Sequence, residues 1–221
     1  ELSKGQAKVV DEGCSKNLII TGGPGTGKTT SILFLLINIL NTYKDYNVYL
    51  TAPSGKAASR MKESILGSLD CVKEDFKNQN QELITKIKKL EESTIHRLLS
   101  FNSESSDFTY NKNYQFPDKS IFVIDEASMI DICIFNSLLE AIPTNARVFI
   151  MGDKNQLPSV ECGAVFGELL KMDILKDNII ELDESKRFKE NTDIYKLANI
   201  INNNQKLNIS QEDFRQVSDF K

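Results

Sequence analysis

The chain has 221 residues, of which 40% are hydrophobic and 26% are charged, and its formal net charge is −4. This length suits one large or two small domains with a substantial core. Its longest apolar run, Ile32–Leu40, is too short to cross a bilayer, and no signal peptide is visible, so we expect no membrane attachment. The acidic balance excludes a globally basic surface, so any nucleic-acid binding has to come from a local cleft.

A glycine-rich segment, Gly22-Gly23-Pro24-Gly25-Thr26-Gly27-Lys28-Thr29, follows the apolar run 18–20 and precedes an apolar helical pattern over 29–40. Strand, glycine-rich loop and helix form the context that a Walker A phosphate loop requires. Backbone N–H groups of such a loop turn toward a phosphate chain, and the helix N-terminus adds partial positive charge. We expect Lys28 to reach the β- and γ-phosphates of ATP and Thr29 to ligate Mg²⁺. The residues predicted to bind ATP here are Gly22, Gly23, Pro24, Gly25, Thr26, Gly27, Lys28, Thr29 and Thr30.

Five short runs rich in Val, Ile, Leu and Phe recur between helical patterns, at 18–21, 48–51, 121–125, 148–151 and 179–182. These runs are continuous rather than alternating, which is typical of parallel strands covered on both faces. The alternation of strands and helices predicts an α/β fold with a largely parallel sheet covered by helices. The catalytic loops are then expected at the carboxyl ends of the strands.

The segment from Ser68 to Lys119 interrupts this alternation. Apolar residues between Leu83 and Leu90 mark one face of a charged helix. Further on, aromatic residues flank Asn111-Lys112-Asn113 within 108–117, which predicts a small hairpin; a disordered surface loop is the alternative. The four cysteines are scattered without a CxxC pair, so we expect reduced thiols in the cytosol rather than zinc ligands or disulfides.

A second catalytic element comes at Asp125-Glu126, directly after the apolar run 121–124. This is a Walker B pattern, in which Asp125 is expected to hold Mg²⁺ and Glu126 to orient and deprotonate the attacking water. After the next strand, the amide of Gln156 is placed to sense the γ-phosphate. Arg187 follows the last strand, where a guanidinium can approach the phosphates.

Six segments in this order resemble the motifs I, Ia, Ib, II, III and IV of superfamily 1 helicases: GGPGTGKTT (22–30), LTAPSGKAASRM (50–61), STIHRLL (93–99), VIDEASMID (123–131), GDKNQLPSV (152–160) and LDESKRF (182–188). The sequences of these motifs are similar to those of the RecD family, the α subunit of bacterial exodeoxyribonuclease V. Phage and plasmid helicases of the same 5′→3′ branch are also similar.

The resemblance implies a RecA-like P-loop NTPase that uses ATP and Mg²⁺ to move 5′→3′ on single-stranded DNA. It implies binding of duplex ends, other subunits of a RecBCD-type complex as partners, and a cytoplasmic role in DNA repair and recombination. It also assigns roles: adenine recognition to Gln6, coupling of nucleotide state to the strand to Gln156, a γ-phosphate contact to Arg187, and strand separation to the hairpin at 108–117. The residues that it implies for DNA contact are Pro53, Ser54, Lys56, Thr94 and His96; for His96, a helix-start residue bonded to a neighbouring carbonyl is the alternative.

From the same resemblance we expect a motor domain over 1–67 and 118–203, an inserted helix and hairpin region over 68–117, and a tail over 204–221 toward a second RecA-like domain. Lys186 stands where the family has an aromatic residue that stacks on adenine, so we do not expect that stacking here. The first residue is Glu1, and no motif V or VI follows, which suggests an excised piece with weak or no ATPase activity of its own. Two alternatives are a P-loop ATPase that does not act on DNA and a nucleotide-bound scaffolding module.

Overall fold

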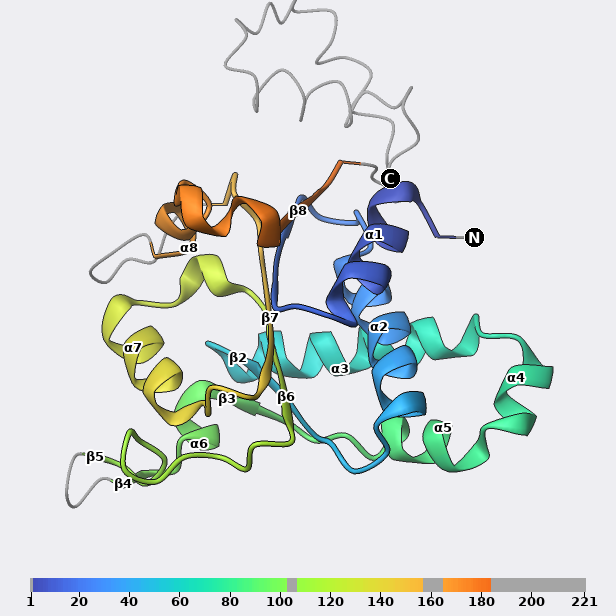
Figure 1. Cartoon of the computed structure of the whole chain (residues 1–221), viewed down its shortest axis with the longest axis horizontal. Coiled ribbons are helices and arrows are strands. Elements are labelled where there is room, and N and C mark those ends of the chain that lie inside the picture. Colours follow the sequence, from blue (N-terminus) through green and yellow to red (C-terminus); the bar gives the residue numbers. More distant parts are fainter. Residues whose placement is uncertain (1, 103–106, 157–164, 184–221) are drawn as a thin grey trace, which may run out of the picture. The chain divides into compact units, whose positions relative to one another are not determined.

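A six-stranded, wholly parallel sheet organises the protein in the computed structural model, which describes residues 2–102, 107–156 and 165–183. The strands lie in the order β3-β2-β6-β7-β1-β8 (Figure 1). Every neighbouring pair runs parallel. The predicted α/β class with a parallel sheet is confirmed. The strand bounds are β1 Leu18–Gly22, β2 Asn47–Ala52, β3 Glu92–Thr94, β6 Ser120–Ile124, β7 Arg147–Gly152 and β8 Ile179–Leu182.

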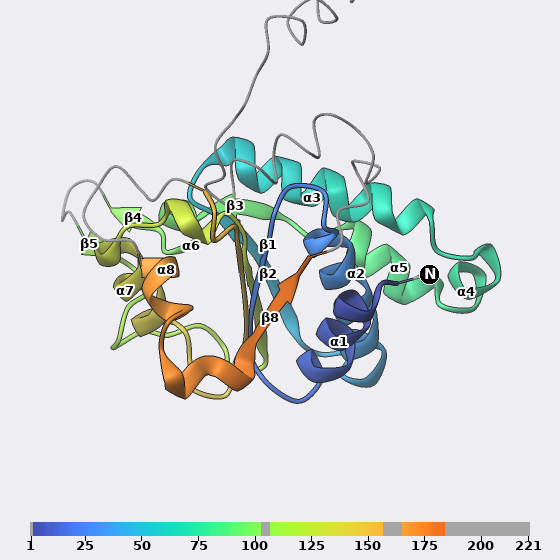
Figure 2. The same ribbon diagram turned by 90° about the horizontal axis from the view of Figure 1, so that it is seen from above.

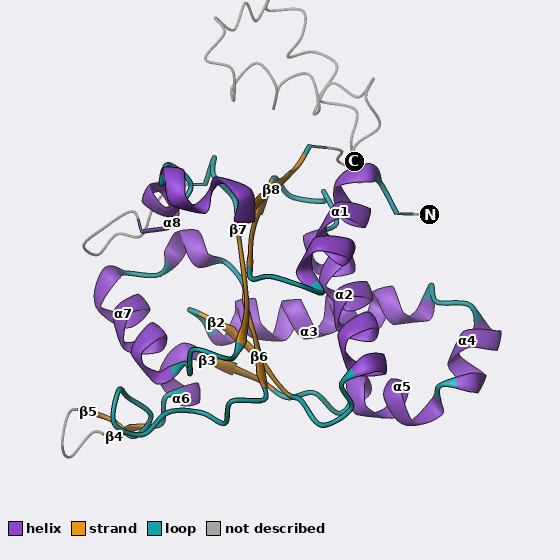
Figure 3. Ribbon diagram, in the orientation of Figure 1, coloured by secondary structure: helices purple, strands orange, loops and turns teal. Residues whose placement is uncertain are grey.

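Helices cover both faces of this sheet (Figure 3). The first face packs against α1 (Lys4–Gly13), α2 (Lys28–Thr42), α3 (Gly55–Asp70) and α5 (Gln81–Lys88), with α4 (Glu74–Gln79) between α3 and α5. The second face packs against α6 (Ile95–Leu98), α7 (Ile132–Ala141) and α8 (Val165–Leu169). Two 3-10 helices, η1 (Ala127–Met129) and η2 (Asp173–Asn178), complete the connections.

Two cores follow from the alternation of side chains along each strand. Leu18 and Ile20 of β1 join the core under α1 and α2, whereas Ile19 between them joins the core under α7. Because both faces are buried, β1 needs an apolar residue at each of these positions. This explains why continuous apolar runs identified the central strands.

Strand β3 requires a correction to the predicted domain bounds. Residues 92–94 fall inside the segment assigned to the insertion, yet they form the edge strand of the main sheet, with Leu50 opposite Glu92 and Ala52 opposite Thr94. The Thr51 hydroxyl donates to the Ser93 carbonyl at 3.1 Å and helps to hold this short polar strand. The sequence gives no apolar signal for it, because Glu92, Ser93 and Thr94 are all polar.

Within 108–117, a single antiparallel bridge between Asn111 and Tyr114 closes the predicted turn. The antiparallel pair in this region joins β4 (Phe101–Asn102) to β5 (Asp107–Phe108), so its strands lie before the predicted turn. At the turn itself, the Asn111 side chain accepts from Asn113 N at 2.9 Å and donates to Phe108 O at 2.9 Å. The backbones of Asn111 and Tyr114 bond each other at 3.0 and 3.1 Å. With these bonds and the 3.9 Å ring stack of Tyr110 on Phe116, the segment is a tight turn whose pairing is limited to this one bridge.

Candidate nucleotide-binding site

The carboxyl ends of all six strands lie at one edge of the sheet, because the strands are parallel. Figure 2 shows β1 and β8 side by side in this sheet. The glycine-rich loop follows β1, and the Asp125-Glu126 pair follows β6. The loop that carries Gln156 follows β7, which lies between β6 and β1. The topology therefore brings the three predicted catalytic loops together.

The glycine-rich loop has the backbone that a phosphate loop needs. Gly25 and Gly27 adopt φ values of 81° and 83°, the left-handed region that glycine occupies without steric cost. The Thr26 hydroxyl donates to Gly23 O at 2.9 Å and closes the turn. Gly27 is the N-cap of α2, so the positive end of a 15-residue helix points into the loop.

Lys28 links the two ends of this loop. Its ammonium donates to the carbonyl of Gly22 and, at 3.3 Å, to that of Gly23. Burial lowers the pKa of Lys28, while the negative charges of Asp125, Asp153 and Glu126 act in the opposite direction. The Lys28 ammonium is therefore attracted by carboxylates that follow β6 and β7.

Asp125 and Glu126 are positioned by their backbone as well as by β6. The Asp125 amide donates to Thr51 O at 2.9 Å, and its Oδ1 accepts from the Glu126 amide at 2.8 Å. Burial raises the pKa of Asp125 to about 6. Glu126 has φ 53° and ψ 39°, a left-handed conformation that is uncommon outside glycine.

This donor set fits a magnesium ion that is shared with phosphate. Among the described residues, no group of three His, Cys, Asp or Glu side chains could hold a metal alone. Mg²⁺ commonly takes only one or two protein carboxylates and completes its octahedron with water and phosphate oxygens. Asp125 and the Thr29 hydroxyl at the start of α2 match that pattern.

Ser128 is a residue that the sequence did not reveal. Its hydroxyl donates to Gln156 Oε1 at 2.6 Å and joins the turn after β6 to the turn after β7. A serine three residues after a Walker B aspartate carries no chemical signal of its own. Only the juxtaposition of the two loops gives it a role.

Two of the residues assigned to ATP make other contacts. The Thr30 hydroxyl bonds the Ser68 hydroxyl of α3 at 3.0 Å, so this side chain faces α3. The Gln6 side chain is 1% exposed and lies against the glycine-rich loop. Arg187 and Lys186 lie outside the described residues, so their predicted relation to the phosphates stays a prediction.

The residues assigned to DNA form a second group on the same edge. Ala52 at the end of β2 lies opposite Thr94 at the end of β3, so the segments that begin at Pro53 and at Ile95 leave the sheet from neighbouring strands. The hydroxyls of Ser54 and Thr94 both cap helices, accepting from Ala57 N and Arg97 N at 3.2 Å. Lys56 and His96 are exposed.

His96 lies beside an aromatic pair. Its ring centroid is 6.3 Å from that of Phe101 and 6.0 Å from that of Phe108, and those two rings are 5.3 Å apart. The described contacts of the imidazole are therefore with rings. The alternative in which a neighbouring carbonyl satisfies it stays open.

Thr51 connects the nucleotide group to the DNA group. This buried residue of β2 accepts the Asp125 amide on its carbonyl and donates its hydroxyl to Ser93 O. Two hydrogen bonds thus join the Asp125-Glu126 turn to β3, which ends at Thr94 just before His96. A shift of either turn has to move or break one of them.

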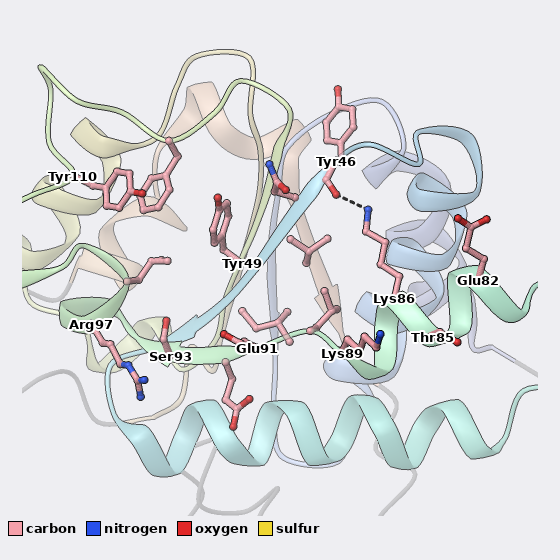
Figure 4. Close-up of a pocket in the computed structure, with 17 residues that line it drawn as sticks. Tyr46, Tyr49, Glu82, Thr85, Lys86, Lys89, Glu91, Ser93, Arg97 and Tyr110 are labelled. Carbon is pink, nitrogen blue, oxygen red and sulfur yellow. Dashed lines mark hydrogen bonds between the residues drawn. The ribbon is translucent and has the colours of Figure 1, made fainter.

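A cavity of about 750 Å³ lies away from these loops, beside the first half of β2 (Figure 4). Strand β3 pairs only with residues 50–52, so the edge of β2 is open before Leu50. Lys86 of α5 reaches across and donates to the carbonyls of Tyr46 and Lys44, at 2.8 and 2.7 Å. Lys86 thus ties α5 to the turn that precedes β2.

Known proteins share sequence similarity with most of this chain. Residues 6–162 match the model of a family described as an AAA domain. The RecD subunit of the RecBCD enzyme of Haemophilus influenzae is 34% identical over 211 residues, covering 83% of this chain and 32% of that protein. The ATP-dependent RecD2 DNA helicase of Deinococcus radiodurans is 34% identical over 163 residues, covering 73% of this chain and 19% of that helicase.

Solved structures show the same fold. A Bacteroides Pif1 bound to single-stranded DNA superposes with a TM-score of 0.55 at 19% identity, over 99% of this chain and 49% of that one. The Pif1 helicase of Candida albicans gives 0.53 at 18% identity, over 98% of this chain and 46% of that one. These likenesses confirm the RecA-like P-loop fold.

The chain spans about a third of the length of the RecD relatives that it matches. In the described part, no helix has the length and apolar character required to span a membrane. The resemblance to RecD that the six motifs carry is confirmed by these relatives. From the match of residues 6–162, the chain belongs to the AAA domain family, and RecD subunits of RecBCD enzymes are among its relatives.

Proposed function

We propose that this chain is the first motor lobe of an ATP-dependent 5′→3′ DNA helicase of the RecD type, acting in the cytoplasm in DNA repair and recombination. The observation that supports this most directly is the shared edge of the sheet, where the phosphate loop, the Asp125-Glu126 turn and the ends of β2 and β3 lie together. The relatives named RecD and RecD2 support the same conclusion.

In the proposed reaction, bound Mg·ATP supplies the phosphoanhydride bond that is cleaved. Lys28 would donate to the phosphate oxygens, and Asp125 with Thr29 would hold the ion. Glu126 orients the attacking water and accepts its proton. Gln156 turns its amide NH₂ toward the γ-phosphate, because Ser128 already bonds its Oε1.

The energy of this step reaches DNA through the residues after β2 and β3. Ser54, Lys56, Thr94 and His96 contact the sugar-phosphate backbone, which gives affinity without sequence preference. A second RecA-like lobe supplies an arginine to the γ-phosphate and completes the cycle. Without such an arginine, turnover falls by about 10³–10⁵-fold, so we expect residues 1–221 alone to bind Mg·ATP but to hydrolyse it weakly.

The test is binding of a fluorescent single-stranded oligonucleotide to residues 1–221 with Mg²⁺ and a non-hydrolysable ATP analogue, followed by anisotropy over a range of salt. We expect affinity to fall linearly with the logarithm of salt, since each phosphate contact releases counterions. Lys56→Ala is expected to reduce both the affinity and the slope. Lys8→Ala, which removes an equally exposed charge from α1, is the matched control and should change neither.

Two outcomes contradict the proposal. If the protein binds the ATP analogue but no oligonucleotide at low salt, it is a P-loop ATPase with a different substrate or a nucleotide-bound scaffold. If Lys8→Ala and Lys56→Ala weaken DNA binding equally, the ends of β2 and β3 are not the DNA-contacting surface.

A further inference from the structure

The turn that carries Gln156 is exposed, and its own backbone and side chains set its shape. Asp153 O accepts from Gln156 N at 3.2 Å, and Asp153 Oδ1 accepts from Asn155 N at 2.9 Å. The Ser128 hydroxyl joins the far end of the turn to the segment after β6. A separate contact ties the turn to β1, from which the phosphate loop begins.

Thr21 makes that contact. It is the last residue but one of β1, and its side chain is buried. Its hydroxyl oxygen accepts a hydrogen bond from the Lys154 amide at 3.2 Å. Thr21 lies opposite Gly152, the last residue of β7, so its side chain stands next to the point where the turn leaves that strand.

Packing alone does not require a threonine at this position. Leu18, Ile19 and Ile20, the residues before it in β1, are apolar and buried, and Thr21 is as buried as they are. Valine has nearly the same shape as threonine and carries no polar group. A hydroxyl that is removed from water costs free energy unless it is hydrogen-bonded. The bond to the Lys154 amide accounts for the hydroxyl.

Lys154 has a second anchor on the neighbouring strand. Its ammonium pairs with the Glu181 carboxylate of β8, and Glu181 lies opposite Thr21 in the pairing of β1 with β8. Each side chain of this ion pair is 44% exposed, so water screens their attraction. The bond from the amide to the buried hydroxyl is therefore the stronger of the two anchors.

We propose that Thr21 is a positioning residue for the γ-phosphate, because its hydroxyl fixes the turn 153–156 at the place where Gln156 meets the terminal phosphate of ATP. The inference rests on the proposed nucleotide binding and deepens it. Gly22, the first glycine of the phosphate loop, follows Thr21 directly, so one residue holds the loop and the turn together. ADP lacks the phosphate that Gln156 meets, so the contact favours ATP over ADP.

The experiment is calorimetric binding of Mg·ADP and of a non-hydrolysable Mg·ATP analogue to residues 1–221. Thr21→Val keeps the shape of the side chain but cannot accept the Lys154 amide, whereas Thr21→Ser keeps the acceptor. We expect Thr21→Val to lower the preference for the analogue over ADP by about three- to ten-fold, the size of one lost hydrogen bond, and to leave the affinity for ADP unchanged. Thr21→Ser should keep most of the preference.

Two further variants separate positioning from stability. Ser120→Ala removes another buried hydroxyl, which donates to Pro117 O at the opposite end of the sheet. It should lower the melting temperature and leave the preference for the analogue unchanged. Gln156→Ala should lower that preference, and the addition of Thr21→Val to it should lower the preference no further, because both substitutions remove the same contact.

The outcomes distinguish this inference from the proposed function. If Thr21→Val weakens the binding of both nucleotides equally, or of neither, the inference is wrong. Additive losses in the double variant also overturn it, since Thr21 then does not act through Gln156. If the wild type binds both nucleotides without a preference, the inference fails while the nucleotide site stands. If the wild type binds neither, the proposed nucleotide binding itself fails.

Discussion

At the scale of single residues, the site depends on charges held where water is scarce. Asp125 has a raised pKa because it is buried, and Lys28 has a lowered pKa for the same reason. Burial therefore favours the neutral form of both groups. A bound polyphosphate would stabilise the charged form of Lys28, and its magnesium ion would stabilise the charged form of Asp125.

The raised pKa of Asp125 predicts a pH dependence of stability in the absence of magnesium. The pKa is about 6 in the folded protein and 3.8 in the ordinary carboxyl, so the folded state holds the proton more tightly. The resulting contribution to the free energy of unfolding is complete below pH 4 and is lost as the pH rises through 6. Its size is about 2–3 kcal/mol.

Urea unfolding of the wild type and Asp125→Asn in EDTA, from pH 4 to pH 7, measures this term. The difference between the two proteins isolates residue 125 from the other carboxylates. We expect the stability of the wild type relative to Asp125→Asn to decline over this range. A difference that does not vary with pH would show that Asp125 titrates normally.

Glu126 supplies a second prediction at this scale, because its left-handed backbone is strained for a glutamate. Asparagine adopts this region more readily than glutamate does. Glu126→Asn should therefore raise the free energy of unfolding by about 0.5–1 kcal/mol. Glu126→Gln is the matched control, because it removes the same charge but keeps the strained backbone. We expect it to leave the free energy of unfolding unchanged. If urea unfolding shows the same change for Glu126→Asn and Glu126→Gln, the backbone at residue 126 is not strained.

At the scale of secondary-structure elements, one side chain from α5 ties down the turn that precedes β2. Lys86→Met keeps the apolar stem and removes the bonds to the carbonyls of Tyr46 and Lys44. We expect a loss of about 1–2 kcal/mol in the free energy of unfolding, since hydrogen bonds to a charged group contribute about that much. Chemical denaturation measures it.

Lys88→Met is the control for that experiment, because Lys88 stands in the same last turn of α5 and is exposed. It shares the favourable interaction of a cation with the helix C-terminus. If both substitutions lower the free energy of unfolding equally, the bonds of Lys86 to the turn before β2 contribute nothing beyond that interaction.

Whether an element could be predicted from the sequence depends on which interactions stabilise it. The central strands and α2 were predicted because they bury apolar residues on every side that faces the core. Strand β3 was not, since a hydrogen bond from Thr51 and the pairing with β2 define it. The turn at Asn111 was predicted, but its pairing stops at the Asn111–Tyr114 bridge because the Asn111 side chain bonds the neighbouring backbone.

The same distinction holds for the site. Lys28, Asp125 and Glu126 were predicted from residue type and spacing, because phosphate chemistry requires them after a strand. Ser128 and the contacts of Gln6 were not, since each depends on a loop far away in the sequence. Contacts across 20 or 28 residues are set by the topology of the sheet.

At the scale of the whole molecule, nucleotide binding should stabilise the folded state. A ligand at 100 times its dissociation constant adds about 2.7 kcal/mol to the free energy of unfolding. For a domain of this size, we expect Mg·ATP to raise the melting temperature by roughly 5–10 °C. Thermal melts with and without Mg·ATP measure this shift.

Two variants locate the source of that shift. Lys28→Ala should abolish it, because the ammonium that meets the phosphates is gone. Glu126→Gln should keep it, since the carboxylate acts on water rather than on the nucleotide. An undiminished shift in Lys28→Ala would mean that ATP binds somewhere other than the glycine-rich loop.

The left-handed turn at residue 126 has a consequence for anyone who engineers this domain. Selection for heat resistance alone would favour replacing the glutamate, because relaxing that turn is an easy gain. Each such gain would remove the carboxylate that we propose orients the attacking water. Mutant libraries that are selected for thermal stability should therefore keep Glu126 unchanged.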